Sequence, residues 1–334
     1  MKILVIQKKF MGDVLVTSTI LPLLKDKFPD SEISFMVEEK HAQILVGNPY
    51  INHFIFFTDS FLKNLSEIKV QKFDVVIDLY SKIETGALTL LSGAKTKIGF
   101  FKKYTQFFYN FPVKRVTRLK SKNTTFGIEH RLQMLEPLGI NFQEVFPKIY
   151  LSVKEVENAH QILSENRLSV KDNLIMLSTF GSGEKKTYPI EYMTEVINDI
   201  SSYKPNSKIL CNYMPFQKDL FDELYNRLSE NSKKLVIKNF NTKSLREFAA
   251  VTSLCKCLIG NEGGATNVSK SLGIPTFTIF SPQIQLVDWA WTSNPKMDRF
   301  LHVKDFVPNS ESYSDLKPNF FESELKEFLD NTIL

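Results

Sequence analysis

Short apolar runs alternate with amphipathic stretches along the chain. Ile3–Ile6 is an apolar run that predicts a buried strand, and Val14–Lys27 follows it with apolar residues at helical spacing. The next predicted strands are Ile33–Val37, Phe54–Phe57 and Val75–Leu79. Strands that alternate with helices in this way are typical of a parallel, doubly wound sheet.

The second half of the chain repeats this order. Leu174–Ser178 is a predicted strand, and a helix is predicted to open at Pro189, because proline is favoured in a first helical turn. The later predicted strands are Lys208–Cys211, Leu235–Ile237, Cys257–Ile259 and Thr276–Phe280, with a helix at Leu245–Ser253. Since 334 residues are too many for one comfortable core, we predict an α/β protein with two Rossmann-like, doubly wound domains.

The predicted boundary between the two domains lies near Ser152. Residues 1–152 are expected to form an N-terminal domain, and residues 153–320 a C-terminal domain. Residues 321–334 are expected to form a helix that packs back toward the N-terminal domain. Two such domains would face a central cleft at the carboxyl ends of their strands, where ligands bind in doubly wound folds.

The composition indicates the class of protein and its expected cellular location. The chain is 43% hydrophobic and 24% charged, which is ordinary for a soluble globular protein. Three cysteines, an odd number, are predicted to be reduced and buried. The apolar run after Met1 is too short for a signal peptide, and no run is long enough to span a bilayer. We expect a cytoplasmic protein, with peripheral contact at the inner membrane face left open.

The first candidate motif is the loop after the first strand. Gly12 permits a tight turn there, and Asp13 stands at or beside the start of the following helix. By spacing alone, a helix N-cap is the favoured interpretation of Asp13. The alternative is a general base that takes the proton from a hydroxyl during sugar transfer.

The second candidate motif follows the predicted strand Cys257–Ile259. Gly263 and Gly264 let backbone amides approach a ligand, and the helix that opens there favours a diphosphate. Glu262 offers a carboxylate to a sugar hydroxyl. A glycine-rich turn without a ligand is the plainer alternative, but strand, glycines, helix and the exit at residues 273–275 occur together and favour a ligand site.

The third candidate motif is the loop 178–189. Thr179 and Ser182 carry hydroxyls that can donate to phosphate oxygens, and Lys186 can neutralise a leaving diphosphate. A pair of solvated lysines is an equally good interpretation of residues 185 and 186.

Charge is unevenly distributed. The net charge is +5, yet the segment from Lys95 to Arg131 holds ten basic residues and a single acid, Glu129, with aromatic residues interleaved. Nucleic acid is one partner that such a segment fits. An anionic glycolipid at a membrane surface is another, and a solvated loop is the third alternative.

No motif predicts a metal or a cofactor. The chain has no D-x-D triplet, and its five histidines are scattered without ligand spacing.

Together these motifs resemble family 9 glycosyltransferases, the heptosyltransferase family. The pair Gly12-Asp13 and the Phe-Pro at 28–29 are similar to that family's opening, and Phe73–Leu79 looks like its fourth strand. The run 186–189, Lys-Thr-Tyr-Pro, is similar to its Lys-x-Trp-Pro element. Residues 260–275 are similar to its motif G-N-D-T-G-P-x-H, which ends in L-G-I-P.

The resemblance implies a GT-B fold and an inverting, metal-independent transfer, with residues 1–152 as the acceptor-binding domain and residues 153–320 as the nucleotide-sugar-binding domain. The usual donor would be ADP-heptose, and the usual acceptor the lipopolysaccharide inner core. Asp13 would be the catalytic base and Lys186 would assist the departing diphosphate. The expected donor-binding residues are Thr179, Ser182, Lys186, Glu262, Gly263, Gly264 and Asn267. The expected acceptor-binding residues are Lys102, Lys103, Arg115, Arg118 and Lys120, and nucleic acid is not expected as a partner.

Three residues depart from the family motif. Glu262 replaces an aspartate, Gly263 a threonine and Asn267 a histidine. The extra methylene of Glu262 moves its carboxylate by about 1.5 Å, so a hexose or another nucleotide stays open as the donor. Two other functions also stay open: a nucleotide-sugar epimerase on the same fold, and a non-catalytic nucleotide-sugar binder.

Overall fold

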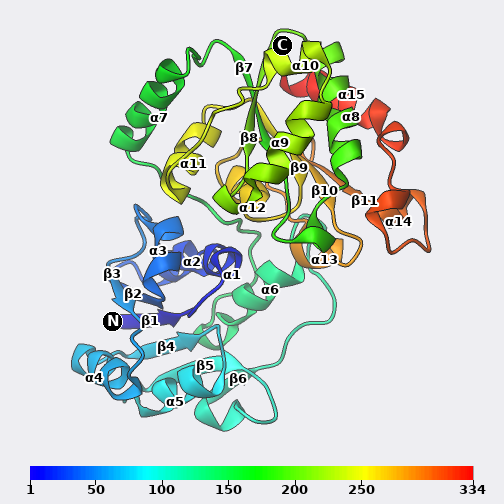
Figure 1. The fold of residues 1–334 in the computed structure, drawn as a ribbon. Helices are drawn as coiled ribbons and strands as arrows, with labels where there is room; N and C mark the ends of the chain where they lie inside the picture. The colour runs from blue at the N-terminus through cyan, green and yellow to red at the C-terminus, as the bar shows by residue number, and fades with distance from the viewer. Residues whose placement is uncertain (334) are drawn as a thin grey trace. The chain divides into compact units, whose positions relative to one another are not determined.

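A computed structural model describes residues 1–333, which divide into two compact units. The first unit is Met1–Tyr150 and the second begins at Leu151, close to the boundary predicted at Ser152. Each unit has one parallel sheet with helices packed against it (Figure 1). The predicted α/β class with two doubly wound sheets is therefore confirmed.

The first sheet has six parallel strands in the order β3-β2-β1-β4-β5-β6. They are β1 Lys2–Ile6, β2 Glu32–Val37, β3 His53–Phe56, β4 Val75–Asp78, β5 Thr96–Phe100 and β6 Phe111–Val113. The strand order reverses at β1, which pairs with β2 on one side and β4 on the other. Ligands of doubly wound sheets bind beyond the carboxyl ends of the strands at such a reversal.

The helices of the first unit include one correction to the sequence analysis. They are α1 Met11–Thr17, α2 Ile20–Lys27, α3 Glu39–Ala42, α4 Phe61–Gln71, α5 Ile83–Leu91 and α6 Phe126–Gln133. The single helix predicted at Val14–Lys27 is divided into α1 and α2. The hydroxyls of Ser18 and Thr19 donate to backbone carbonyls three residues earlier, at 2.6 and 2.8 Å, and this back-bonding competes with regular helix.

The second sheet has five parallel strands in the order β11-β10-β9-β7-β8. They are β7 Asn173–Ser178, β8 Ser207–Asn212, β9 Cys257–Asn261, β10 Thr276–Phe280 and β11 Arg299–His302. The strand predicted at Leu235–Ile237 is not formed. Leu235 ends a helix, and Val236 makes only an isolated bridge to Ile209, because the apolar run is too short to extend the ladder.

The last helix packs into the core of the second unit. The helices of this unit are α7 Val153–Glu165, α8 Ile190–Tyr203, α9 Lys218–Arg227, α10 Glu230–Leu235, α11 Leu245–Thr252, α12 Gly264–Ser271, α13 Leu286–Trp289, α14 Val303–Phe306 and α15 Glu322–Thr332. Leu325, Phe328 and Leu329 of α15 are buried on one helical face, and Phe328 lies 5.4 Å from the ring centre of Phe277 in β10. α15 therefore packs on the second sheet, and the expectation that it also lies toward the N-terminal domain stays a prediction.

The cysteines lie where the sequence analysis predicted. Cys211, Cys255 and Cys257 are free thiols in the interior. Burial raises the pKa of Cys211 and of Cys257 to about 12, so both are protonated and inert at neutral pH. Among residues 1–333, the helices are all too short or too polar to cross a bilayer.

A buried carboxyl group organises the carboxyl end of β4. Asp78 is fully buried and accepts hydrogen bonds from the Ser81 amide and the Tyr109 hydroxyl, both at 2.8 Å. The Tyr109 ring covers Gly99, where an added Cβ would lie 2.2 Å from the ring. Burial raises the pKa of Asp78 to about 6, although the hydrogen bond from Ser81 opposes the shift.

Asp78 is expected to make stability depend on pH. Its folded pKa of about 6 lies above its ordinary value of 3.8, so its contribution is full at low pH and is lost as the pH rises through 6. Relative to an Asp78→Asn variant, wild type should gain about 1 kcal/mol in free energy of unfolding from pH 7 to pH 5. Urea denaturation of both proteins at the two pH values measures this gain. An exposed control, Asp30→Asn, should leave the pH dependence unchanged; equal slopes for wild type and Asp78→Asn would contradict the assignment.

Candidate active site

The carboxyl edge of the first sheet carries several charged side chains. Lys8 and Asp13 follow β1, Lys82 and Glu84 follow β4, and Lys102 follows β5. Because these strands are parallel and adjacent, the loops that follow them leave the sheet at the same edge. This edge is therefore the candidate acceptor side of the site.

Asp13 lies in the first turn of α1 and is not the N-cap. The N-cap is Phe10, and no side chain caps the helix, so the N-cap interpretation of Asp13 is wrong. The Asp13 carboxylate instead accepts a hydrogen bond from the Arg131 guanidinium of α6. The Asp13 side chain keeps 31% of its surface exposed, whereas Arg131 keeps 12%. Asp13 is thus anchored from inside the protein while still facing solvent.

Arg131 belongs to the interior of the first unit. Its guanidinium also donates to the Gly127 carbonyl at 2.6 Å and to the Thr17 hydroxyl at 3.1 Å. Burial lowers the pKa of Arg131, and the Asp13 carboxylate opposes that shift. The sequence analysis counted Arg131 only as the last member of a basic segment. It missed the pairing because 118 residues separate the two partners.

Phe10 is both strained and exposed. Its φ is 70° and its ψ is 110°, a conformation that a bulky L-residue rarely adopts. Its side chain is 59% exposed, beside the turn that carries Asp13. Backbone strain of this kind concentrates at functional sites.

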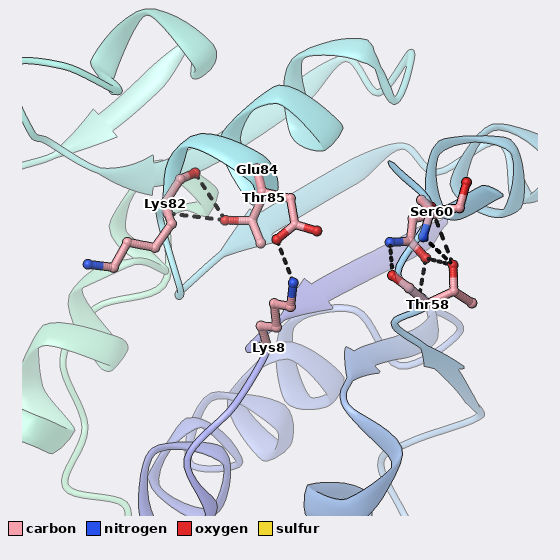
Figure 2. Close-up of polar contacts among 7 residues, drawn as sticks. Lys8, Thr58, Ser60, Lys82, Glu84 and Thr85 are labelled. Carbon is pink, nitrogen blue, oxygen red and sulfur yellow. Dashed lines mark hydrogen bonds and ion pairs between the residues drawn. The ribbon is translucent and has the colours of Figure 1, made fainter. Parts of the chain in front are cut away.

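Figure 2 shows how the neighbouring loops are held. The Lys8 ammonium contacts the Glu84 carboxylate of α5 at 2.5 Å, while the Lys82 side chain points away from this pair. The Thr85 hydroxyl contacts both the amide and the carbonyl of Lys82 at 3.1 and 3.2 Å, which fixes the start of α5. The loops after β1 and β4 are therefore tied together by an ion pair.

The five predicted acceptor-binding residues have different surroundings. Lys102 is half-buried and donates to the Ser81 carbonyl at 2.7 Å; burial lowers its pKa, and Lys82 and Arg115 lower it further. Arg115 stacks over the Phe100 ring at 4.6 Å. Lys120 lies 3.4 Å from Glu136. Lys103 and Arg118 are exposed.

The single acid of the basic segment does not neutralise its surface. Glu129 is buried, and its carboxylate accepts hydrogen bonds from the amides of Lys120 and Ser121 and from the Thr124 hydroxyl. Glu129 therefore stabilises the conformation of the segment from its buried side. The positive charges on the surface stay largely uncompensated within the segment.

In the second unit, a buried amide joins three loops. Asn261 ends β9, and its Nδ2 donates to the carbonyls of Ser178 and Thr179 at 3.0 and 2.8 Å. Its Oδ1 accepts a hydrogen bond from the Tyr188 amide at 2.7 Å. Asn261 thus fixes the loop after β7, the start of α8 and the glycine loop relative to one another. The sequence analysis missed this residue, since only its distant partners reveal its role.

Two glycines allow these loops to pack closely. Gly260 has φ 126°, and a Cβ there would lie 2.4 Å from the Ser178 carbonyl oxygen. A Cβ on Gly181 would lie 1.9 Å from the carbonyl oxygen of Lys186. No larger residue fits at either position, so both glycines are required by close backbone approach.

The predicted donor-binding residues are only partly brought together. Burial raises the pKa of Glu262, and Lys186 is near enough to oppose the shift, so these two side chains share one electrostatic neighbourhood. Ser182 and Gly264 are exposed, and Gly263 is half-buried. Thr179 and Asn267 are buried, and the Thr179 hydroxyl lies 3.4 Å from the Leu177 carbonyl. The Thr179 side chain does not face solvent, although the predicted hydrogen bond from its hydroxyl to a phosphate would require it to.

A buried lysine lies in the helix that follows the glycine loop. Lys270 is 3% exposed, donates to the Trp289 carbonyl at 3.1 Å and lies 4.3 Å from the centre of the Trp291 ring. Burial lowers the pKa of Lys270 to about 7, which Asp298 and Glu262 oppose. Lys270 anchors α12 to the segment after α13. Among the described residues, no three His, Cys, Asp or Glu side chains gather as a metal site would require.

Comparison with known proteins shows which family the chain matches. Residues 61–296 match the sequence profile of Glycosyltransferase family 9 (heptosyltransferase). Lipopolysaccharide heptosyltransferase 1 of Campylobacter coli is 25% identical over 303 residues, which cover 84% of this chain and 84% of the relative.

Two solved structures share the fold over nearly the whole chain. The glycosyl transferase family 9 protein of Veillonella parvula has a TM-score of 0.76 at 20% identity, covering 99% of this chain and 96% of that one. The Escherichia coli heptosyltransferase WaaC with ADP-2-deoxy-2-fluoro heptose has a TM-score of 0.72 at 17% identity, covering 98% and 99%. The predicted GT-B fold is thereby confirmed.

We expect Asn261→Ala to destabilise the second unit. The change leaves one buried amide and two buried carbonyls without this partner, at a cost of about 2–4 kcal/mol in free energy of unfolding. Asn212→Ala is the matched control, because Asn212 ends the nearby strand β8 and is half-buried. Denaturant unfolding monitored by circular dichroism measures both changes. A loss no larger than that of the control would show that the amide junction does not hold the loops.

Proposed function

We propose that this chain, which belongs to glycosyltransferase family 9, the heptosyltransferase family, transfers a heptose from ADP-heptose to the core of lipopolysaccharide. Family membership makes it a glycosyltransferase. The observation that carries the proposed chemistry is the Asp13 carboxylate, which keeps 31% of its side-chain surface exposed while the largely buried guanidinium of Arg131 holds it. A general base needs both a fixed position and access to its substrate.

In the proposed reaction, Asp13 takes the proton of an acceptor hydroxyl. The hydroxyl oxygen then bonds to the anomeric carbon of the donor from the face opposite the diphosphate, which inverts that carbon. The bond from the anomeric carbon to the diphosphate oxygen breaks, and its electron pair leaves with ADP. Because Arg131 bonds Oδ1 of Asp13, Oδ2 is the oxygen that receives the proton.

Lys186 is the proposed partner of the leaving ADP. Its ammonium is exposed beside Glu262 and supplies positive charge without a metal ion. Gly263 and Gly264 open α12, an eight-residue helix whose first amides would meet the diphosphate. Ser182 would donate to a phosphate oxygen. Thr179 and Asn267 are buried, so they would shape the donor site from behind.

The donor is proposed from the relatives together with Glu262. WaaC, a structural neighbour, is described with an ADP-heptose analogue. Glu262 stands in the glycine loop, and burial raises its pKa, so it lies in a partly desolvated position suited to reading a sugar hydroxyl. We propose that this carboxylate selects the sugar.

The acceptor is proposed to be an anionic glycolipid at the inner face of the membrane, reached from the cytoplasm. Lys103 and Arg118 are exposed and suited to phosphate or carboxylate groups, and Lys102, Arg115 and Lys120 add charge nearby in the sequence. Nucleic acid is the weaker alternative, because family 9 enzymes act on sugars. An epimerase and a non-catalytic binder would leave the acceptor-side charges without a use.

The proposal predicts acceptor-dependent release of ADP in the presence of excess EDTA. Incubation with ADP-heptose should release ADP with deacylated lipopolysaccharide core and not without it. Sugar conversion without acceptor would identify an epimerase, and neither product would identify a binder.

In the same assay, Asp13→Asn should lower kcat by about 10²–10⁴-fold and leave the KM for the donor within about twofold. Asp26→Asn, an exposed change in α2, is the control, and turnover of Asp13→Asn near wild type would reject the base.

Glu262→Asp is expected to change the choice of donor. Shortening the side chain withdraws the carboxylate by about 1.5 Å, so kcat/KM should shift between donors that differ at one hydroxyl while stability changes little. Competition between ADP-heptose and ADP-hexoses measures the ratio. Glu191→Asp, on the surface of α8, serves as the control. An unchanged ratio would mean that Glu262 does not read the sugar.

A further inference from the structure

One face of α5 is apolar although it is exposed. Ile83, Leu90 and Leu91 are 64%, 44% and 45% exposed. With Ala87 they occupy positions i, i+4, i+7 and i+8, which lie on one side of a helix. The opposite side is buried against the sheet through Thr85, Gly86, Leu88 and Thr89. A helix in this layer ordinarily turns polar residues to solvent, so the apolar outer face needs a partner.

An aromatic side chain extends this face. Phe107 is 65% exposed and lies 4.3 Å from the neighbouring Phe108 ring, measured between ring centres. Phe108 packs against α5 at Gly86, where an added Cβ would lie 2.2 Å from its ring. The segment that carries Phe107 is therefore fixed to the side of α5. We define the α5 face as Ile83, Ala87, Leu90, Leu91 and Phe107.

Exposed basic residues stand close to the α5 face along the chain. Exposed lysines stand immediately before α5, at Lys82, and four residues beyond its end, at Lys95. Lys103 is exposed four residues before Phe107. The acid of α5, Glu84, is paired with Lys8, and Lys82 points away from that pair (Figure 2). The apolar face of α5 is thus preceded and followed along the chain by exposed lysines.

We propose that the α5 face docks on the surface of an anionic lipid bilayer. Apolar and aromatic side chains would enter the boundary between headgroups and acyl chains, and the lysines would remain at the headgroup phosphates. Exposed apolar patches with a polar rim mark interaction sites in general, and the charge selects the partner here. The inference goes beyond the transfer reaction, since it assigns a binding surface to the apolar residues of the α5 face, which have no part in the chemistry.

Two other partners fit the α5 face less well. A second copy of the chain, joined by a two-fold axis, would bring the same lysines of both copies close together without intervening acids. A nucleic acid would contact the lysines but leave the apolar centre exposed to water. A bilayer satisfies both parts of the surface.

Flotation with lipid vesicles tests the proposal on the full chain. Wild type should bind vesicles that contain phosphatidylglycerol and not vesicles of phosphatidylcholine alone. Leu90→Gln/Phe107→Gln should lower the bound fraction at least tenfold. The matched control is Leu62→Gln/Val70→Gln on α4, where the side chains are 75% and 73% exposed, and it should bind within twofold of wild type. Lys82→Glu/Lys95→Glu should remove the preference for anionic vesicles, and raised salt should act in the same direction.

The outcomes separate this proposal from the transfer reaction. Leu90→Gln/Phe107→Gln should keep activity toward the soluble, deacylated acceptor, while losing vesicle binding. Equal binding by wild type and this variant would overturn the membrane surface whatever the activity. If wild type is a dimer and Leu90→Gln/Phe107→Gln is a monomer with unchanged vesicle binding, the membrane proposal is overturned. The α5 face would then be a contact between two copies of the chain. Vesicle binding that depends on the α5 face would stand even if transfer to lipopolysaccharide core were absent.

Discussion

The buried amide of Asn261 is the interaction on which the second unit's loops depend. It sits at the end of a central strand; its Nδ2 bonds two adjacent carbonyls at the end of β7, and its Oδ1 bonds the amide of Tyr188 before α8. An amide is suited to this position, because one end donates twice and the other end accepts, with no charge to desolvate. Through Tyr188, whose hydroxyl donates to the Leu316 carbonyl, the junction extends to the segment before α15. Lys186 and Glu262 thus sit on loops whose spacing is set by one side chain.

In the first unit, charged side chains hold the loops at the ends of the strands. Asp78 holds the turn after β4 and the Tyr109 ring, while Arg131 holds Asp13 and the end of α1. Buried charges are costly unless they are paired, so these contacts specify their loops strongly. Ser81 links the Asp78 arrangement to the basic surface, since its carbonyl accepts a hydrogen bond from the Lys102 ammonium. Polar groups at strand ends, rather than the apolar cores, position the functional side chains.

Much of the fold follows from local pattern. Apolar runs identify eight of the eleven strands of the described residues, and the strand-to-helix loops locate Asp13, Lys186 and Glu262. The local sequence pattern predicts the wrong element where a single side chain decides between two local structures. The hydroxyls of Ser18 and Thr19 divide a periodic stretch into two helices, and Val236 makes a single bridge to the edge strand β8 because Leu235 still belongs to helix α10. Arg131 and Asn261 could not be found in this way, because their partners lie 118 and 73 to 83 residues away.

The strained backbone at Phe10 has a consequence for engineering. A non-glycine residue at φ 70° stores about 1–3 kcal/mol, and glycine would adopt the same turn without that penalty. A search for thermostable variants would therefore select glycine at position 10. The same change would remove the exposed ring beside Asp13 and loosen the turn from which α1 starts. A gain in melting temperature at this residue would therefore come with changed surroundings for Asp13, so it is a poor guide to a better enzyme.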